Sequence, residues 1–130
     1  ESQQIFDQRP TVLAAAQEGT TAVLTYRAAT VDADVAANQQ FVTGAFAEEY
    51  ETLIATTILP NATERGTSSA ARVFGSSLIS ADAESAQTLV FVAQELTSAD
   101  NPEAQTTVTA MRVGLVKEGD RWLINALKPL

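Results

Sequence analysis

The sequence predicts an α+β fold in which three N-terminal helices pack on a curved four-stranded antiparallel sheet. Up to about residue 65, apolar residues recur at spacings of three and four, as they do along one face of a helix. From about residue 66, glycine, serine and β-branched residues increase and helical periodicity stops, which is typical of strands. The strand candidates are joined by connections too short for parallel crossovers, so the sheet is predicted to be antiparallel and cone-shaped.

The first helix is predicted over residues 7–27, where the apolar stripe includes Val12, Ala16 and Val23. Asp7 is expected to cap its start, and Pro10 would be tolerated in the first turn. Gly19 lies inside this helix at a cost of about 1 kcal/mol relative to alanine. We therefore expect Gly19 to mark a close contact with a neighbouring element.

Two further helices are predicted over residues 33–41 and 45–59, separated by Gly44. The stretch from Thr30 to Asp34 supplies capping side chains before the second helix. One side of the third helix carries Phe46, Tyr50, Leu53, Ile54 and Ile58. Pro60 is expected at or just after the end of the third helix, because proline disrupts helix interiors.

Four strands are predicted over residues 69–80, 86–97, 105–117 and 121–127. Gly75 suggests a bulge or bend in the first strand. The connecting turns are expected at residues 81–84, 98–103 and 118–120, the last with Gly119 at positive φ.

Apolar residues occur on both faces of the last two strands. In the third strand Met111, Val113 and Leu115 share one face, while the other carries Val108, Ala110, Arg112, Gly114 and Val116. In the fourth strand, Trp122, Ile124 and Ala126 are expected to share a face. A curved sheet covered by helices on its inner side explains this pattern, and its outer face could then meet another chain.

Composition restricts the classes of function. The 130 residues suit a single domain, 45% of them are hydrophobic, and the net charge is −8. Neither nucleic acid nor an anionic membrane surface is expected to attract such a chain. Histidine and cysteine are absent, which excludes the usual zinc sites and the nucleophile–histidine arrangements. No apolar run approaches the length of a membrane span, and the chain, which does not begin with methionine, is expected to be cut from a longer protein.

Several residues have both a chemical and a structural interpretation. Asp32 and Asp34 could act as paired carboxylates, but helix capping is the favoured role. Tyr26 could donate a hydrogen bond into a cavity, but it is more typical of a core tyrosine, as is Tyr50. Arg112 could bind an anion; the alternative is cross-strand pairing, for example with Glu95.

Three other features carry little chemistry. Trp122 is either a binding hot spot or, as favoured, an anchor in the core. Residues 61–63, Asn-Ala-Thr, match the glycosylation acceptor pattern. Gly114 and Gly119 form no phosphate-binding loop. The sequence therefore predicts no catalytic, cofactor-binding or metal-binding residues.

The order of these segments resembles the actinobacterial Mce-associated membrane proteins, where Mce stands for mammalian cell entry. The resemblance runs from about residue 12 to residue 130 and includes Tyr26, the Thr30–Asp34 and Thr43–Tyr50 segments, and the Leu89–Val92 strand. It also includes the closing hairpin, Met111-Arg-Val-Gly-Leu-Val116 with Gly119-Asp-Arg-Trp-Leu-Ile124, and the ending Leu127-Lys-Pro-Leu130.

The resemblance implies a cone like that of nuclear transport factor two. It also implies an N-terminal membrane anchor outside the given chain, with this domain on the outer side of the cytoplasmic membrane. The implied partners are the subunits of Mce transporters that import lipids or sterols, and the implied role is to stabilise or assemble them without catalysis. The family has no catalytic motif to carry over.

Three functions follow as hypotheses. The favoured one is an interaction module of the cell envelope, which could also form homo-oligomers. The second is a lipid-binding carrier with an apolar pocket in the cone. The third is an enzyme of the ketosteroid isomerase or dehydratase kind, for which Tyr26 with Asp32 or Asp34 is the only set available.

Overall fold

The structure is a computed structural model that describes residues 2–130, with side chains described from residue 8 onward. Helices occupy the first half of the chain and strands the second, which confirms the predicted α+β order. The helices are α1 (Ser2–Val23), α2 (Val31–Asn38), α3 (Gly44–Leu53) and α4 (Leu59–Arg65), with 3₁₀ turns at Ala28–Thr30 and Gln39–Phe41 and a π turn at Ile54–Ile58. The strands are β1 (Ser68–Ala81), β2 (Ser85–Ser98), β3 (Asn101–Glu118) and β4 (Arg121–Pro129).

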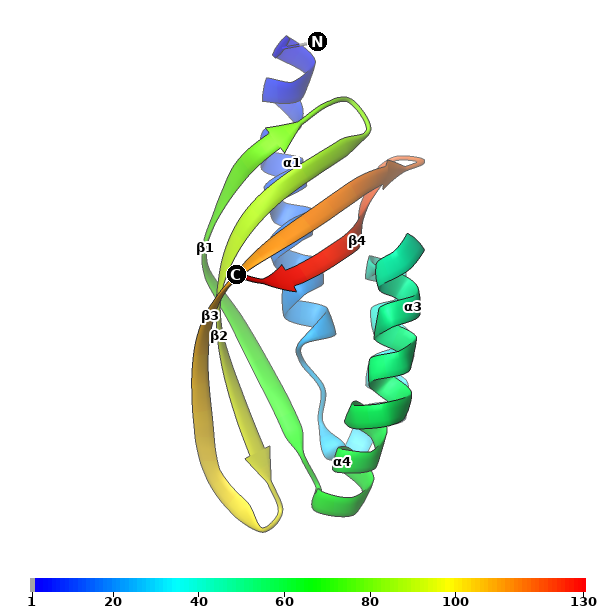
Figure 1. Ribbon diagram of the computed structural model, residues 1–130, viewed down its shortest axis with the longest axis vertical. Coiled ribbons are helices and arrows are strands. Elements are labelled where there is room, and N and C mark those ends of the chain that lie inside the picture. The colour runs from blue at the N-terminus through cyan, green and yellow to red at the C-terminus, as the bar shows by residue number, and fades with distance from the viewer. Residues whose placement is uncertain (1) are drawn as a thin grey trace.

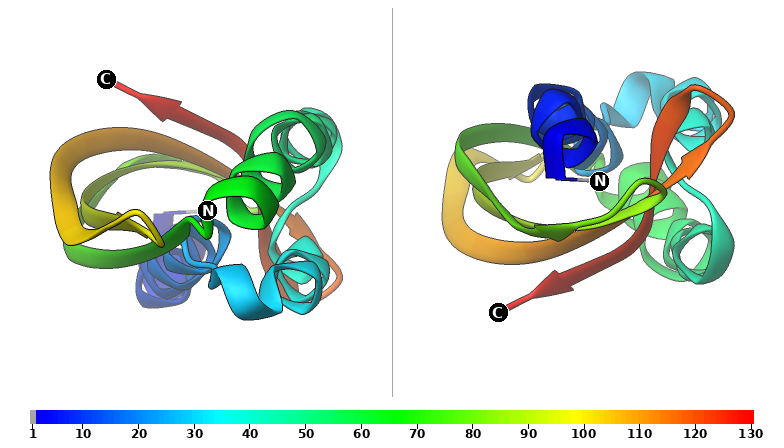
Figure 2. Two further views of the ribbon diagram at one scale, coloured as in Figure 1. Left: turned by 90° about the horizontal axis from the view of Figure 1, so that it is seen from below. Right: turned by 90° about the horizontal axis from the view of Figure 1, so that it is seen from above.

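The sheet has the strand order β1-β2-β3-β4, and all three pairings are antiparallel. It is strongly curved, with α1 lying along it and the helix formed by α3 and α4 standing to one side (Figures 1 and 2). The far end of the β2–β3 hairpin extends beyond α1, toward the end of the molecule where α4 lies (Figure 1). Three helices on a curved four-stranded sheet are thus confirmed.

The first helix begins and ends earlier than the pattern predicts. It starts at Ser2 and not at residue 7, so Pro10 lies inside the helix and Asp7 is not its first residue. The predicted cap at Asp7 falls on a side chain outside the described ones. It ends at Val23 because the following residues pair with the sheet, where Tyr26 and Ser69 exchange two backbone hydrogen bonds. The second helix likewise begins at Val31 and passes into a 3₁₀ turn at Gln39.

The third helix does not stop at Pro60. The segments α3, the π turn and α4 follow without a break, so the helix runs from Gly44 to Arg65. Leu59 N–H donates to the carbonyl of Ile54, five residues back, which widens the helix immediately before the proline. This π turn accommodates a residue that cannot donate a hydrogen bond. The helix ends instead at Gly66, which adopts the left-handed conformation with φ 63°.

Two of the four register shifts in the sheet bear on the predicted strand pattern. The expected irregularity at Gly75 is confirmed, because the β1–β2 register shifts between Val73 and Gly75. A second shift leaves Asn125 without a partner on β3, since Gly114 pairs with Ala126 and Leu115 with Ile124. Beyond this bulge the alternation of side chains between the two faces reverses, so Leu127 packs against the core. The prediction that Ala126 shares a face with Trp122 and Ile124 is therefore wrong.

The predicted hairpin turns are confirmed, and each is shorter than expected, most clearly the turn between β2 and β3. Gly119 has φ 65° in the β3–β4 turn. In the β1–β2 turn, backbone N–H groups of Glu84 and Ser85 donate to Asp82 Oδ1, each at 2.9 Å, and they lower the pKa of this carboxyl. The β2–β3 turn occupies only residues 99–100, so Pro102 lies within β3 instead of in the turn.

The core lies between the helices and the concave side of the sheet. Its least exposed large side chains are Tyr50, Leu115, Ile124, Val12, Val90, Val92 and Val113. The predicted close contact at Gly19 is confirmed, because a Cβ atom there would lie 2.7 Å from Ile124 Cδ1. Within the described part of the chain, no helix combines the length and the apolar character needed to cross a membrane.

Candidate functional site

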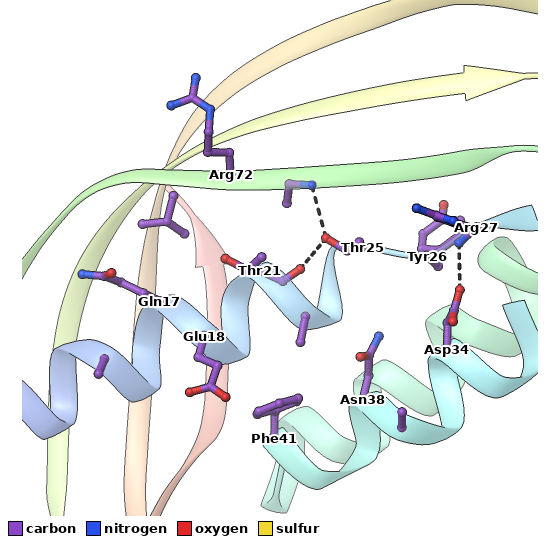
Figure 3. A pocket seen from close by; sticks show the side chains of 15 residues that line it. Gln17, Glu18, Thr21, Thr25, Tyr26, Arg27, Asp34, Asn38, Phe41 and Arg72 are labelled. Carbon is purple, nitrogen blue, oxygen red and sulfur yellow. Dashed lines mark hydrogen bonds between the residues drawn. The ribbon is translucent and has the colours of Figure 1, made fainter. Parts of the chain in front are cut away.

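An open groove of about 790 Å³ lies on one flank, between α1, α2 and the first half of β1 (Figure 3). Its walls are mainly alanine, threonine and amide side chains, with Glu18, Arg27, Asp34 and Arg72 as the charged groups. Arg72 points away from the helices (Figure 3). The groove is therefore open to solvent, with ionisable groups among mainly apolar walls, whereas a lipid carrier needs an enclosed pocket.

Polar contacts fix the end of α1 to β1 along this groove. Ser69 Oγ donates to the carbonyl of Leu24 at 2.6 Å, and Ala71 N–H donates to Thr25 Oγ1 at 3.2 Å. Gln17 Nε2 donates to Ser76 Oγ at 2.6 Å. Sequence patterns gave no signal for this set, because its partners lie more than forty residues apart.

Tyr26 and Tyr50 are both buried, as favoured from the sequence. Burial raises the pKa of the Tyr26 hydroxyl. Burial also raises the pKa of Tyr50, although Asn38 Nδ2 donates to Tyr50 Oη at 3.1 Å and acts in the opposite direction. Both hydroxyls are thus held in the neutral form, as expected for core tyrosines.

Asp34 has a structural role in the groove. Its Oδ2 accepts hydrogen bonds from the Arg27 N–H and from Thr30 Oγ1, both at 2.9 Å, and so it ties the segment before α2 to that helix. The favoured helix-capping interpretation is wrong for Asp34, because its carboxylate reaches back seven residues and neither the 3₁₀ turn nor α2 has a side-chain cap. Asp32 is exposed in the first turn of α2, where a negative charge is favourable.

The arrangement does not assemble the acid–base set that an isomerase would need. That hypothesis requires a free carboxylate facing Tyr26 inside the cone. The interior is instead filled by buried side chains such as Tyr50, Leu115 and Ile124, while Asp34 lies on the flank with its Oδ2 bonded to Arg27 and Thr30. Among the described residues, no group of three or more acidic side chains is placed to hold a metal ion.

The convex side of the sheet, which we call the outer sheet face, presents exposed apolar side chains. Phe74 and Phe91 are 50% and 37% exposed, and their ring centroids lie 6.1 Å apart. The Arg72 guanidinium carbon lies 5.9 Å from the centroid of the Phe74 ring. Val108, on the same face, is 65% exposed. Exposed aromatic rings beside arginine are typical of protein-binding surfaces.

The same face brings two cations directly opposite each other. Arg112 pairs with Lys128 in the β3–β4 register, with Leu89 on its other side. The suggested Arg112–Glu95 pairing is wrong, because Glu95 lies opposite Thr106. Like charges at directly opposed positions destabilise a sheet, so this pair favours a ligand or partner that supplies negative charge.

The two remaining sequence candidates lie elsewhere. Trp122 is buried in the core, as favoured, and is not an exposed hot spot. Asn61 lies in the first turns of α4, with Ala62 buried and Thr63 exposed, so the acceptor pattern falls on a helix. Neither position contributes to the outer sheet face.

Comparison with known proteins identifies relatives by sequence. No protein-family model matches the chain. It is 34% identical over 116 residues to Outer membrane protein Rv1973 of Mycobacterium tuberculosis, an alignment that covers 89% of this chain and 72% of the relative. It is 31% identical over 118 residues to Uncharacterized protein Rv1362c of the same species, covering 91% of this chain and 54% of that protein. The chain belongs to the family of the mycobacterial protein Rv1973.

Solved structures share the fold at low sequence identity. An IcmL-like type IV secretion system protein from Legionella pneumophila aligns with a TM-score of 0.78 at 12% identity, over 94% of this chain and 91% of that one. The periplasmic domain of DotI aligns with a TM-score of 0.76 at 13% identity, over 93% of this chain and 94% of that one. An Ntf2-like protein involved in plasmid conjugation aligns with a TM-score of 0.58 at 14% identity, over 93% of this chain and 47% of that one. The predicted cone like that of nuclear transport factor two is thus confirmed as a fold.

Proposed function

We propose that this chain is a non-catalytic domain of the cell envelope that binds subunits of an Mce-type lipid or sterol import complex and stabilises their assembly. The observation that carries the proposal is the outer sheet face. There, exposed aromatic rings share a face with two directly opposed cations, on a chain whose net charge is −8.

The chemistry of this face defines the partner surface that would fit it. Phe74 and Phe91 offer apolar area that loses contact with water on binding. Arg112 and Lys128 repel each other until a carboxylate from the partner lies between them. The partner surface is therefore apolar at its centre and acidic at one side, and charge complementarity sets its orientation.

The comparisons support an envelope role. The relative Rv1973 is named an outer membrane protein, and two structural neighbours are named as a periplasmic domain and a secretion system protein. The Mce assignment is supported by the resemblance of the helical segments and of the closing hairpin described above. On this proposal, residues 1–130 act as one domain on the outer side of the cytoplasmic membrane, and the full-length protein carries a membrane anchor.

Co-purification tests the proposal. The full-length protein, tagged and expressed in its native host, is expected to retain Mce transporter subunits after detergent extraction. The double variant Phe91→Ser, Arg112→Glu is expected to retain at least about fivefold less. The matched control is Leu53→Ser, which removes a similarly exposed side chain from α3, on the helical side of the molecule.

Two results would count against the proposal. One is equal recovery of transporter subunits with the outer-face variant and the control. The other is unchanged transporter abundance after deletion of the gene.

A further inference from the structure

The groove between α1, α2 and β1 contains two nearly buried side chains with polar atoms that lack a partner. Tyr26 is 9% exposed and Asn38 is 7% exposed, and both line the groove. Among residues 8–130 the Tyr26 hydroxyl makes no hydrogen bond, and Asn38 uses only its amide nitrogen, which donates to Tyr50 Oη. In this part of the chain, the fully enclosed side-chain atoms without a partner belong to Gln8 and Thr20. Tyr26 Oη and Asn38 Oδ1 therefore remain open to the groove.

These two open atoms are one hydrogen-bond donor and one acceptor. Burial raises the pKa of Tyr26, so its hydroxyl keeps its proton and can donate. The side-chain carbonyl oxygen of Asn38 can only accept. A main-chain amide offers the matching pair, because its C=O accepts and its N–H donates. Since nearly buried polar groups are normally hydrogen-bonded, their open state here points to a ligand that supplies both partners.

The first half of β1 supplies backbone groups along one wall of the groove. On the side away from β2, Ser69 exchanges two backbone hydrogen bonds with Tyr26. On the same side, the N–H of Ala71 donates to Thr25 Oγ1. Direction alternates along a strand, and the β1–β2 register is unbroken up to Val73, so the N–H and C=O of Val73 also face this side. No backbone group among residues 2–130 pairs with them there, which leaves a strand edge that an extended peptide can lengthen.

One peptide segment can reach both parts of the groove. Tyr26 pairs with Ser69, and Val73 lies four residues further along β1, which is about 13 Å in a strand. An extended segment of about six residues is longer than this distance. Its backbone can therefore bond to Val73 at one end and to Tyr26 and Asn38 at the other.

The charges of the groove indicate which side chain such a peptide carries. Glu18 is exposed on α1 and points toward the side where Phe41 lies (Figure 3). Asp34 and Arg27 carry opposite charges, and Arg72 points away from the helices (Figure 3). The uncompensated charge of the groove is therefore that of Glu18. A lysine or arginine fits this place, since its apolar stem can cover the Phe41 ring while its charge meets the Glu18 carboxylate.

We propose that this groove binds an extended segment of a partner protein that carries a lysine or arginine. The backbone of the segment bonds to Tyr26 Oη, Asn38 Oδ1 and the open edge at Val73, and its basic side chain lies between Glu18 and Phe41. The open shape of the groove suits a chain segment better than a small molecule, because small-molecule pockets enclose most of their ligand. This inference goes beyond the function proposed above, which rests on the outer sheet face, and each can fail without the other.

A random dodecapeptide library displayed on phage and panned on the immobilised chain tests the inference. Enriched peptides are expected to contain lysine or arginine more often than aspartate or glutamate. Each enriched peptide is then synthesised with a fluorophore, and its dissociation constant is measured by fluorescence anisotropy. This constant is expected to rise with salt concentration, because salt screens the contact with the exposed Glu18.

Two variants locate the bound peptides in the groove. Tyr26→Phe removes only a hydroxyl that makes no hydrogen bond in the free chain, so the urea midpoint is expected not to fall. The dissociation constants of the peptides are nevertheless expected to rise about fivefold. Glu18→Lys reverses the charge beside the basic side chain and is expected to raise them about tenfold.

Two controls separate the groove from other surfaces. Glu51→Lys makes the same charge change at an exposed position of α3 and is expected to leave the dissociation constants within about twofold. The outer-face double variant Phe91→Ser, Arg112→Glu is also expected to bind the peptides like the parent chain. Circular dichroism of every variant verifies that weaker binding does not reflect a lost fold.

A library that yields no enriched peptide would overturn the inference. So would peptides that bind the Tyr26→Phe and Glu18→Lys variants as tightly as the parent chain. Enrichment of acidic peptides would overturn the charge assignment at Glu18. Peptides whose binding is lost in the outer-face double variant, and not in the groove variants, would place the binding site on the outer sheet face instead and overturn the groove.

Discussion

Two buried threonines show how one hydroxyl can stabilise or destabilise this fold. Thr20 on α1 and Thr88 on β2 are both completely buried. Thr88 Oγ1 donates to the carbonyl of Val113 at 2.9 Å, whereas Thr20 Oγ1 has no hydrogen-bond partner among the described residues. A buried hydroxyl without a partner loses its hydration and gains nothing in return.

The same substitution is therefore expected to have opposite effects at these positions. Thr20→Val should raise the free energy of unfolding by about 1 kcal/mol, because it replaces an unpaired hydroxyl with a methyl group of similar size. Thr88→Val should lower it by about 1 kcal/mol, because it removes the hydrogen bond from the Thr88 hydroxyl to the Val113 carbonyl. Urea denaturation of both variants measures the two values. Destabilisation of equal size in both variants would contradict this explanation.

At the scale of elements, the end of the third helix depends on a single backbone conformation. Gly66 has φ 63°, and a Cβ atom there would also lie 3.0 Å from the Cβ of Ala99 in the β2–β3 turn. Gly66→Ala is expected to lower the free energy of unfolding by about 1–2 kcal/mol. Gly119→Ala is an informative comparison, since its φ is also positive but no atom lies within 4 Å of the added Cβ. A larger loss at Gly119 than at Gly66 would contradict a role for the contact with Ala99.

The sequence predicts the existence and order of these elements better than their ends. Apolar spacing locates every helix and strand, and glycine locates the bulge at Gly75 and the turn at Gly119. The prediction that the third helix ends at Pro60 fails, because a five-residue π turn lets the helix continue through the proline. The predicted alternation also fails after Asn125, because a bulge there reverses the faces of Ala126 and Leu127.

The candidate surfaces were harder to predict for a related reason. Apolar residues on both faces of the strands correctly indicated an outer face that remains exposed. However, the opposition of Arg112 and Lys128 depends on the pairing register, and Asp34 accepts a hydrogen bond from a backbone N–H seven residues upstream. The groove forms only where α1, α2 and β1 meet. Each of these is set by tertiary pairing and leaves no local pattern in the sequence.

At the scale of the whole molecule, Ile124 joins the helices to the sheet. It is almost fully buried and lies opposite Leu115 on β3, and its Cδ1 occupies the space beside Gly19 of α1. Its carbonyl accepts the N–H of Thr43, immediately before the third helix, at 2.9 Å. Ile124 therefore contacts α1, β3 and the start of the third helix at once, which favours a single cooperative unfolding transition.

Ile124→Ala is expected to lower the free energy of unfolding by about 3 kcal/mol, since it opens a cavity where three elements meet. The neighbouring control Leu123→Ala, on the half-buried outer face, should cost about 1 kcal/mol. The chain has one tryptophan, Trp122, so fluorescence follows β4 while far-ultraviolet circular dichroism follows the helices. Because the two parts share Ile124, both signals should change at the same urea concentration in the parent chain. A fluorescence midpoint well below the circular dichroism midpoint would show that β4 separates before the helices unfold, and that the contacts at Ile124 do not couple them.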